Sequence, residues 1–87
     1  MDELRAELEL ARRIFFEALA APPHTVRREA AFGDIPGWDS LGHLKVVAAL
    51  ERALGAELKL SQIRKLNSVE RILELLRARG AGPEEAR

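Results

Sequence analysis

The chain has 87 residues, with fourteen acidic and fourteen basic side chains and a formal net charge of zero. This length allows one small domain with a modest core, and the balanced charge argues against nucleic-acid binding, which usually needs a basic excess. The sequence contains no cysteine, which excludes disulfides and thiolate metal sites. It also lacks a long apolar run and a signal-peptide start, so we expect a cytoplasmic protein without membrane insertion.

The first predicted helix spans Asp2 to about Ala20, in a chain whose Ala-, Leu-, Arg- and Glu-rich composition favours helix. Apolar side chains recur there at steps of three and four, as expected of a helix with one buried face. This stripe consists of Leu4, Leu8, Ala11, Phe15 and Leu19, widened by Leu10 and Ile14. Pro22 and Pro23 are expected to end the helix.

Residues 21–38 form a long predicted connection with three prolines and two glycines. Loops of this length in a small domain are usually functional or packed down by their own side chains. One turn of helix is expected near Arg27–Ala31. The apolar residues expected to pack the loop onto the helices are Val26, Phe32, Ile35 and Trp38.

The second predicted helix runs from about Ser40 to Leu54, and Gly55 is expected to stop it in a left-handed conformation. Its expected core face consists of Leu41, Leu44, Val47, Leu50 or Ala48, and Leu54. Val46 and Ala49 add apolar area on another side, so this helix should be covered by more than one neighbour.

Two further helices follow. Ser61 is expected to cap a short helix over Gln62–Leu66, and Ser68 a last helix from Val69 to about Arg79. The last helix has a core stripe of Val69, Ile72, Leu73 and Leu76. The predicted fold is an all-α four-helix bundle over residues 1–80, with three longer helices and a short third one. Residues 81–87 are expected to form a solvated tail.

The stretch GWDSLGHLKVVAALE, residues 37–51, places Ser40 where the second helix begins. One interpretation is that Asp39 or Ser40 caps the helix. A second pairs Ser40 with His43, since residues three apart share a helix face. Catalysis would also need an orienting acid and an oxyanion site. Asp39 adjoins the serine and there is no G-x-S-x-G motif, so we expect no enzyme. His43 is expected to be solvated or to face a partner.

A third interpretation comes from resemblance. The Asp-Ser-Leu at the head of an apolar helix, after a long loop and before a short helix and NSVERILELL, resembles the acyl carrier proteins over about residues 4–79. The resemblance implies that a transferase attaches 4′-phosphopantetheine from coenzyme A to Ser40. Acyl groups would then be carried as thioesters on the arm's thiol. It also implies that Asp39 helps to hold the transferase's magnesium, that Leu41 partly caps the core and partly contacts the transferase, and that the carrier binds no metal of its own.

The charges depart from those of the familiar fatty-acid carriers, which are acidic on the second helix. Gly42, Lys45 and Arg52 stand where acids are usual, and residues 39–66 carry a net charge of +2. We therefore expect a specialised, stand-alone monomeric carrier that delivers acyl intermediates to enzymes of fatty-acid, polyketide or related biosynthesis. The candidates for partner recognition are His43, Lys45, Glu51, Arg52, Arg64 and Lys65. Gly42 is also expected to loosen the first helical turn.

The resemblance further implies that an acyl chain could be held between the helices. The residues expected to line it are Phe32, Leu44, Val47, Ala48, Leu60, Ile63 and Leu66. Two alternatives stay open. An aminoacyl or peptidyl carrier shares the bundle, although those proteins more often have Gly-Gly-x-Ser before the helix. A helical interaction or DNA-binding module would need a basic, exposed recognition helix. The second predicted helix is too apolar for this role, and the last one balances its charges.

Overall fold

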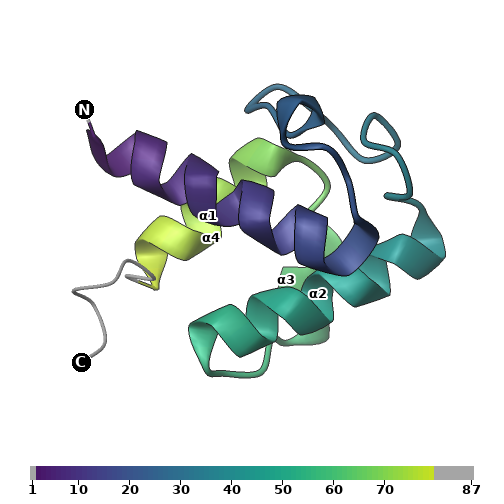
Figure 1. Cartoon of the computed structure of the whole chain (residues 1–87). Helices are drawn as coiled ribbons and strands as arrows, with labels where there is room; N and C mark the ends of the chain where they lie inside the picture. Colours follow the sequence, from purple (N-terminus) through teal and green to yellow (C-terminus); the bar gives the residue numbers. More distant parts are fainter. Residues whose placement is uncertain (1, 80–87) are drawn as a thin grey trace.

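The computed structural model describes residues 2–79, and side chains within residues 5–79. These residues form α1 (Asp2–Leu19), the 3₁₀ helix η1 (Pro23–Thr25), α2 (Ser40–Leu54), α3 (Leu60–Lys65) and α4 (Val69–Ala78). Figure 1 shows α1 crossing both α2 and α4, with the long connection arching over one end of the bundle. The predicted all-α bundle with a short third helix is confirmed. The predicted tail, residues 81–87, lies outside the described residues.

The core forms where α1, α2 and α4 meet. Ala11, Ile14 and Phe15 of α1 are buried there, and Leu8, Leu10 and Leu19 pack against them half-buried. The predicted stripe of α4 is buried in full, namely Val69, Ile72, Leu73 and Leu76. Each fully buried side chain of this size contributes about 1.5–3 kcal/mol through burial of apolar surface.

The core face of α2 agrees with the predicted one at Val47 and Leu50 and differs from it at Leu41 and Leu44. Val46, Val47, Ala49 and Leu50 are buried, whereas Leu41 is 66% and Leu44 is 61% exposed. The helix has apolar side chains at helical spacing on two faces, and periodicity alone does not say which of them meets a neighbour. Packing of α1 against α2 selects the face that contains Gly42, Val46 and Ala49. Leu41 and Leu44 are left on the opposite, solvent-facing side.

The long connection is held at several points. A 3₁₀ turn, η1, lies at Pro23–Thr25, where proline is tolerated in the first turn. Near Arg27, where one turn of helix was expected, the chain forms a single hydrogen-bonded turn in which Ala30 N donates to the Arg27 carbonyl at 2.9 Å. Arg12 of α1 donates from Nε to the Val26 carbonyl at 3.1 Å. Phe32 N donates to the Asn67 carbonyl at 2.8 Å and Val69 N to the Ala30 carbonyl at 2.9 Å, which ties the loop to the start of α4. Val26, Ile35 and Trp38 are buried as predicted.

Two of the predicted helix caps are confirmed and one is wrong. Gly55 adopts the predicted left-handed conformation with φ 68°. Ser68 caps α4 as predicted. The short α3 begins at Leu60 instead of Gln62, because the Gln62 side chain accepts a hydrogen bond from Lys59 N at 2.8 Å. Ser61 therefore lies inside the first turn and is not the cap. Within residues 2–79, no helix is both long and apolar enough to cross a membrane.

Candidate functional site: the start of helix α2

Asp39 is the residue that caps α2. Its backbone is extended, with φ −118°, and its Oδ1 accepts a hydrogen bond from Gly42 N at 2.8 Å. Its carbonyl accepts from His43 N at 2.7 Å, which closes the first turn. Ser40 is then the first helical residue and is exposed. Among the described residues, no group forms a hydrogen bond with the Ser40 hydroxyl. Asp39 thus performs the capping and leaves that hydroxyl available to solvent.

Gly42 allows the preceding loop to cross this first turn at close range. A Cβ at position 42 would overlap the carbonyl oxygen of Gly37 and would lie 3.1 Å from Cδ2 of Leu19. Gly37 itself has a positive φ of 84°, a conformation that glycine adopts readily. This close contact opposes the loosening of the first turn that was expected of Gly42, and that loosening stays a prediction. The missing side chain is what lets the loop pack onto that turn and bury it.

An aromatic cluster lies beside Ser40. Trp38 is 1% exposed and stacks edge-on against Phe15 and Phe32, with centroid distances of 4.9 and 5.7 Å. Its Nε1 donates to Nδ1 of His43 at 3.0 Å. Trp38 thus packs the loop onto the bundle, as predicted.

His43 is half-buried rather than solvated. Its Nδ1 accepts from Trp38, and its Nε2 lies 3.2 Å from the Ile63 carbonyl of α3. Both ring nitrogens are therefore engaged within the chain, which corrects our expectation for this residue. The same geometry leaves no nitrogen free to take a proton from Ser40, so the pair does not form a nucleophile–base dyad. Sequence reasoning missed this link, whose only signal was an aromatic N–H five residues before a histidine.

The charged candidates divide into two groups. Glu51 is half-buried and its Oε2 accepts from Leu58 N at 2.9 Å, so it has a structural role in the turn after α2. Arg52 lies 3.8 Å from Glu17 in an exposed ion pair, a kind that contributes little to stability. Lys45, Arg64 and Lys65 are exposed, and none of them forms an ion pair with another residue of the described part.

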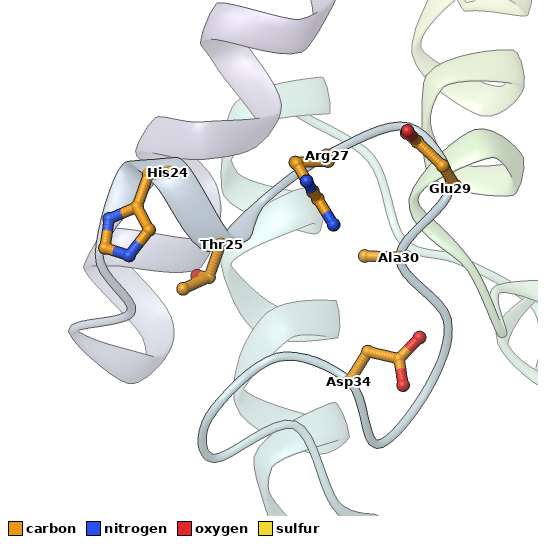
Figure 2. A pocket seen from close by; sticks show the side chains of 6 residues that line it. All are labelled: His24, Thr25, Arg27, Glu29, Ala30 and Asp34. Carbon is orange, nitrogen blue, oxygen red and sulfur yellow. The ribbon is translucent and has the colours of Figure 1, made fainter.

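The residues expected to line an acyl chain are spread between surface and core. Phe32, Leu44, Ala48 and Leu60 are exposed, Ile63 is half-buried, and Val47 and Leu66 are buried. An open depression lies elsewhere, on the long connection, and Figure 2 shows the six side chains around it. They are His24, Thr25, Arg27, Glu29, Ala30 and Asp34. None of them is among the residues expected to line a chain. Over residues 2–79, no group of three histidine or acidic side chains is arranged to hold a metal.

Comparison with known proteins places the chain in a family. The chain matches no protein-family model. It is 30% identical over 69 residues to a protein of Thermosynechococcus vestitus described as "Acyl carrier protein", and the alignment covers 79% of this chain and 85% of that protein. The similarity spans most of the bundle described above. A four-helix fold of this order, a capped helix start with an exposed serine, and this similarity agree. The chain belongs to the acyl carrier protein family.

Proposed function

We propose that this protein carries acyl intermediates as thioesters on a 4′-phosphopantetheine arm attached to Ser40. The observation that supports the proposal is that Asp39 and Ser40 have different roles at the start of α2. Asp39 supplies the cap, and Ser40 is left with an exposed hydroxyl one position further on. The similarity to an acyl carrier protein supports a carrier that performs no catalysis itself.

The chemistry of attachment suits this position. The Ser40 oxygen would attack the pantetheine-linked phosphorus of coenzyme A, and a phosphodiester would form as adenosine 3′,5′-bisphosphate leaves. The proton of the hydroxyl would pass to a base of the transferase. A helix N-terminus favours negative charge, so the start of α2 can accept the phosphodiester. The 87 residues contain no cysteine, so the terminal thiol of the arm would have no competitor within this chain.

Asp39 fits a second role in the same reaction. One carboxylate oxygen, Oδ1, is held by Gly42 N, which fixes the orientation of the group. The carboxylate remains exposed beside Ser40. It would help to hold the magnesium that the transferase requires, and this ion would be present only during the transfer.

The test is an intact-mass measurement after incubation with coenzyme A, magnesium and a phosphopantetheinyl transferase of broad specificity. We expect a gain of one phosphopantetheine in the wild-type protein and none in Ser40→Ala. Ser68→Ala is the matched control, since Ser68 also stands at a helix start, and it should be modified as the wild type is. A folded wild-type protein that gains no mass with several transferases would contradict the proposal.

The exposed surface of α2 and α3 points to partner enzymes different from those of the familiar fatty-acid carriers. Leu41, Leu44 and Lys45 are exposed close to Ser40, and Arg64 and Lys65 are exposed on α3. Two of the acids in this region, Asp39 and Glu51, are held by hydrogen bonds within the chain. Partner enzymes with an acidic rim around an apolar patch would complement this surface.

A specialised pathway, such as polyketide or lipid modification, therefore fits this carrier better than housekeeping fatty-acid synthesis. The measurement is the rate at which the phosphopantetheinylated protein accepts acyl groups from a standard fatty-acid synthase. We expect slow acceptance, and we expect charge reversal of Lys45 and Arg52 to raise the rate. Acceptance as fast as that of an acidic carrier would contradict this part of the proposal.

A further inference from the structure

His43 links segments that meet at the start of α2. Nε1 of Trp38 lies 3.0 Å from Nδ1 of His43, and Nε2 of His43 lies 3.2 Å from the Ile63 carbonyl. An indole N–H is a donor only, so Nδ1 must accept. Nε2 then carries the proton of the neutral ring and donates to the carbonyl. The hydrogen-bond network therefore assigns one tautomer to His43.

The first hydrogen bond holds the segment that leads into Ser40. Trp38 stands two residues before Ser40, and its indole is enclosed by Phe15 and Phe32. Its backbone N–H donates to the Ile35 carbonyl at 2.9 Å, and its carbonyl accepts from Gly33 N at 3.2 Å. Holding the indole in place therefore also holds the turn formed by residues 33–38. This turn sets the direction in which the chain enters Asp39 and Ser40.

The second hydrogen bond holds α3. This helix has six residues and none of them is buried, so its own side chains anchor it weakly. Ile63 is half-buried, and its carbonyl accepts from Leu66 N at 3.2 Å as well as from His43. Phe32 stacks edge-on against the imidazole with a centroid distance of 5.8 Å. The single side chain of His43 therefore connects the long connection before Ser40 with α2 and α3.

We propose that His43 is a positioning residue for the attachment of the arm to Ser40. It acts through Trp38, whose fixed indole holds the loop in the path that makes Asp39 the cap and leaves Ser40 exposed. A transferase must bring a nucleophile into line with a phosphorus atom, and small displacements of the nucleophile lower such rates strongly. The inference rests on the proposed function of Ser40, whereas the hydrogen bond between Trp38 and His43 can be tested independently of that function.

The first measurement uses the only tryptophan of the chain, which yields one indole N–H signal in a ¹⁵N–¹H spectrum. We expect this signal to be protected from solvent exchange in the wild type, and the imidazole ¹⁵N shifts to show the proton on Nε2. His43→Leu keeps most of the side-chain bulk and removes both nitrogens. It should raise the indole exchange rate by about three- to tenfold, the factor expected for one lost hydrogen bond. Equal exchange in both proteins would overturn the proposal.

The second measurement is kcat/KM for phosphopantetheine transfer, made well below the unfolding temperature on variants whose helix content is intact. His43→Leu should lower it about three- to tenfold. Trp38→Phe, which removes the indole N–H together with the five-membered ring, should lower it at least as much, and adding His43→Leu to this variant should cause little further loss. His43→Asn places an oxygen near the position of Nδ1, so it should recover the rate to within about twofold. His24→Leu, at the exposed second histidine, should behave as the wild type does.

The outcomes separate the explanations. A role in packing alone predicts that His43→Leu retains the wild-type rate and that His43→Asn is the poorer variant, and either result would overturn the proposal. If the wild-type protein is not modified at all, the proposed function of Ser40 is wrong, and the proposed positioning role of His43 is wrong with it. In that case the indole exchange result would still stand as a statement about the fold.

Discussion

Two serines of this protein stand at the start of a helix, and the structure uses them in opposite ways. Ser68 is the N-cap of α4, and its Oγ accepts a hydrogen bond from Arg71 N at 3.2 Å. Ser40 stands one position later in its helix, after Asp39 has taken the cap of α2. A shift of one residue in the cap decides whether a hydroxyl satisfies the backbone or stays available for chemistry.

The surroundings of the two serines enforce this difference. Ser68 is half-buried, and it pairs with Ala31 of the long loop in an isolated β-bridge. Ser40 is exposed, while the loop before it packs closely over Gly42 and is held by the indole of Trp38. The fold therefore concentrates contacts around the start of α2 and leaves the Ser40 hydroxyl itself exposed. Four substitutions test this comparison through the free energy of unfolding, measured with denaturant.

Gly42→Ala should have the largest effect, a loss of about 1–3 kcal/mol, because the new Cβ would overlap the Gly37 carbonyl and overpack the contact. Helix propensity acts in the opposite direction. Ala48→Gly, at an exposed position of the same helix, measures the size of the helix-propensity effect alone. It should lower the free energy of unfolding by about 1 kcal/mol. If Gly42→Ala stabilises the protein by the same amount, the loop does not pack on the first turn as described.

Asp39→Ala should cost about 1–2 kcal/mol, because it removes the side-chain cap and a negative charge at a helix N-terminus. Asp39→Asn keeps a good cap and should retain stability to within about 0.5 kcal/mol. Phosphopantetheine transfer should nevertheless fall in both variants, because the proposed magnesium contact needs the carboxylate. An asparagine variant that is modified at the wild-type rate would assign Asp39 to capping alone.

Ser68→Ala should lower the free energy of unfolding by about 0.5–1 kcal/mol. The cap that it removes is a neutral hydroxyl, and its hydrogen bond of 3.2 Å to Arg71 N is exposed and longer than the 2.8 Å bond that Asp39 makes. Transfer to Ser40 should be unchanged, because the two helix starts share no hydrogen bond among the described residues. Ser68→Asn, which preserves a capping oxygen, should recover most of the lost stability. A change in transfer without a change in stability would show that the two serines are coupled.

Ser40→Ala should have the smallest effect on stability, within about 0.5 kcal/mol, because the hydroxyl satisfies no backbone donor. The same variant should lose modification completely, as described above. A loss of stability near that of Asp39→Ala would mean that Ser40 shares the capping of α2, and the contrast with Ser68 would disappear.

Much of this architecture follows from local patterns in the sequence. The apolar stripe of α1 from Leu8 onward, the stripe of α4, the caps at Ser68 and Gly55, and the place of Ser40 at the head of α2 agree with the predictions, whereas the Leu4 side chain lies outside the described ones. These features depend on residues within a turn or two of one another, so their chemistry is visible in the sequence.

Contacts between distant segments decided the rest. The approach of the loop to Gly42 and the packing of α1 selected the buried face of α2 and left Leu41 and Leu44 exposed. The fold also brought His43 between Trp38 and Ile63. Helical spacing of apolar or polar residues indicates that their side chains can be buried or can form hydrogen bonds. Which neighbour meets each side chain depends on where the other segments pack, and only the assembled tertiary structure holds that information.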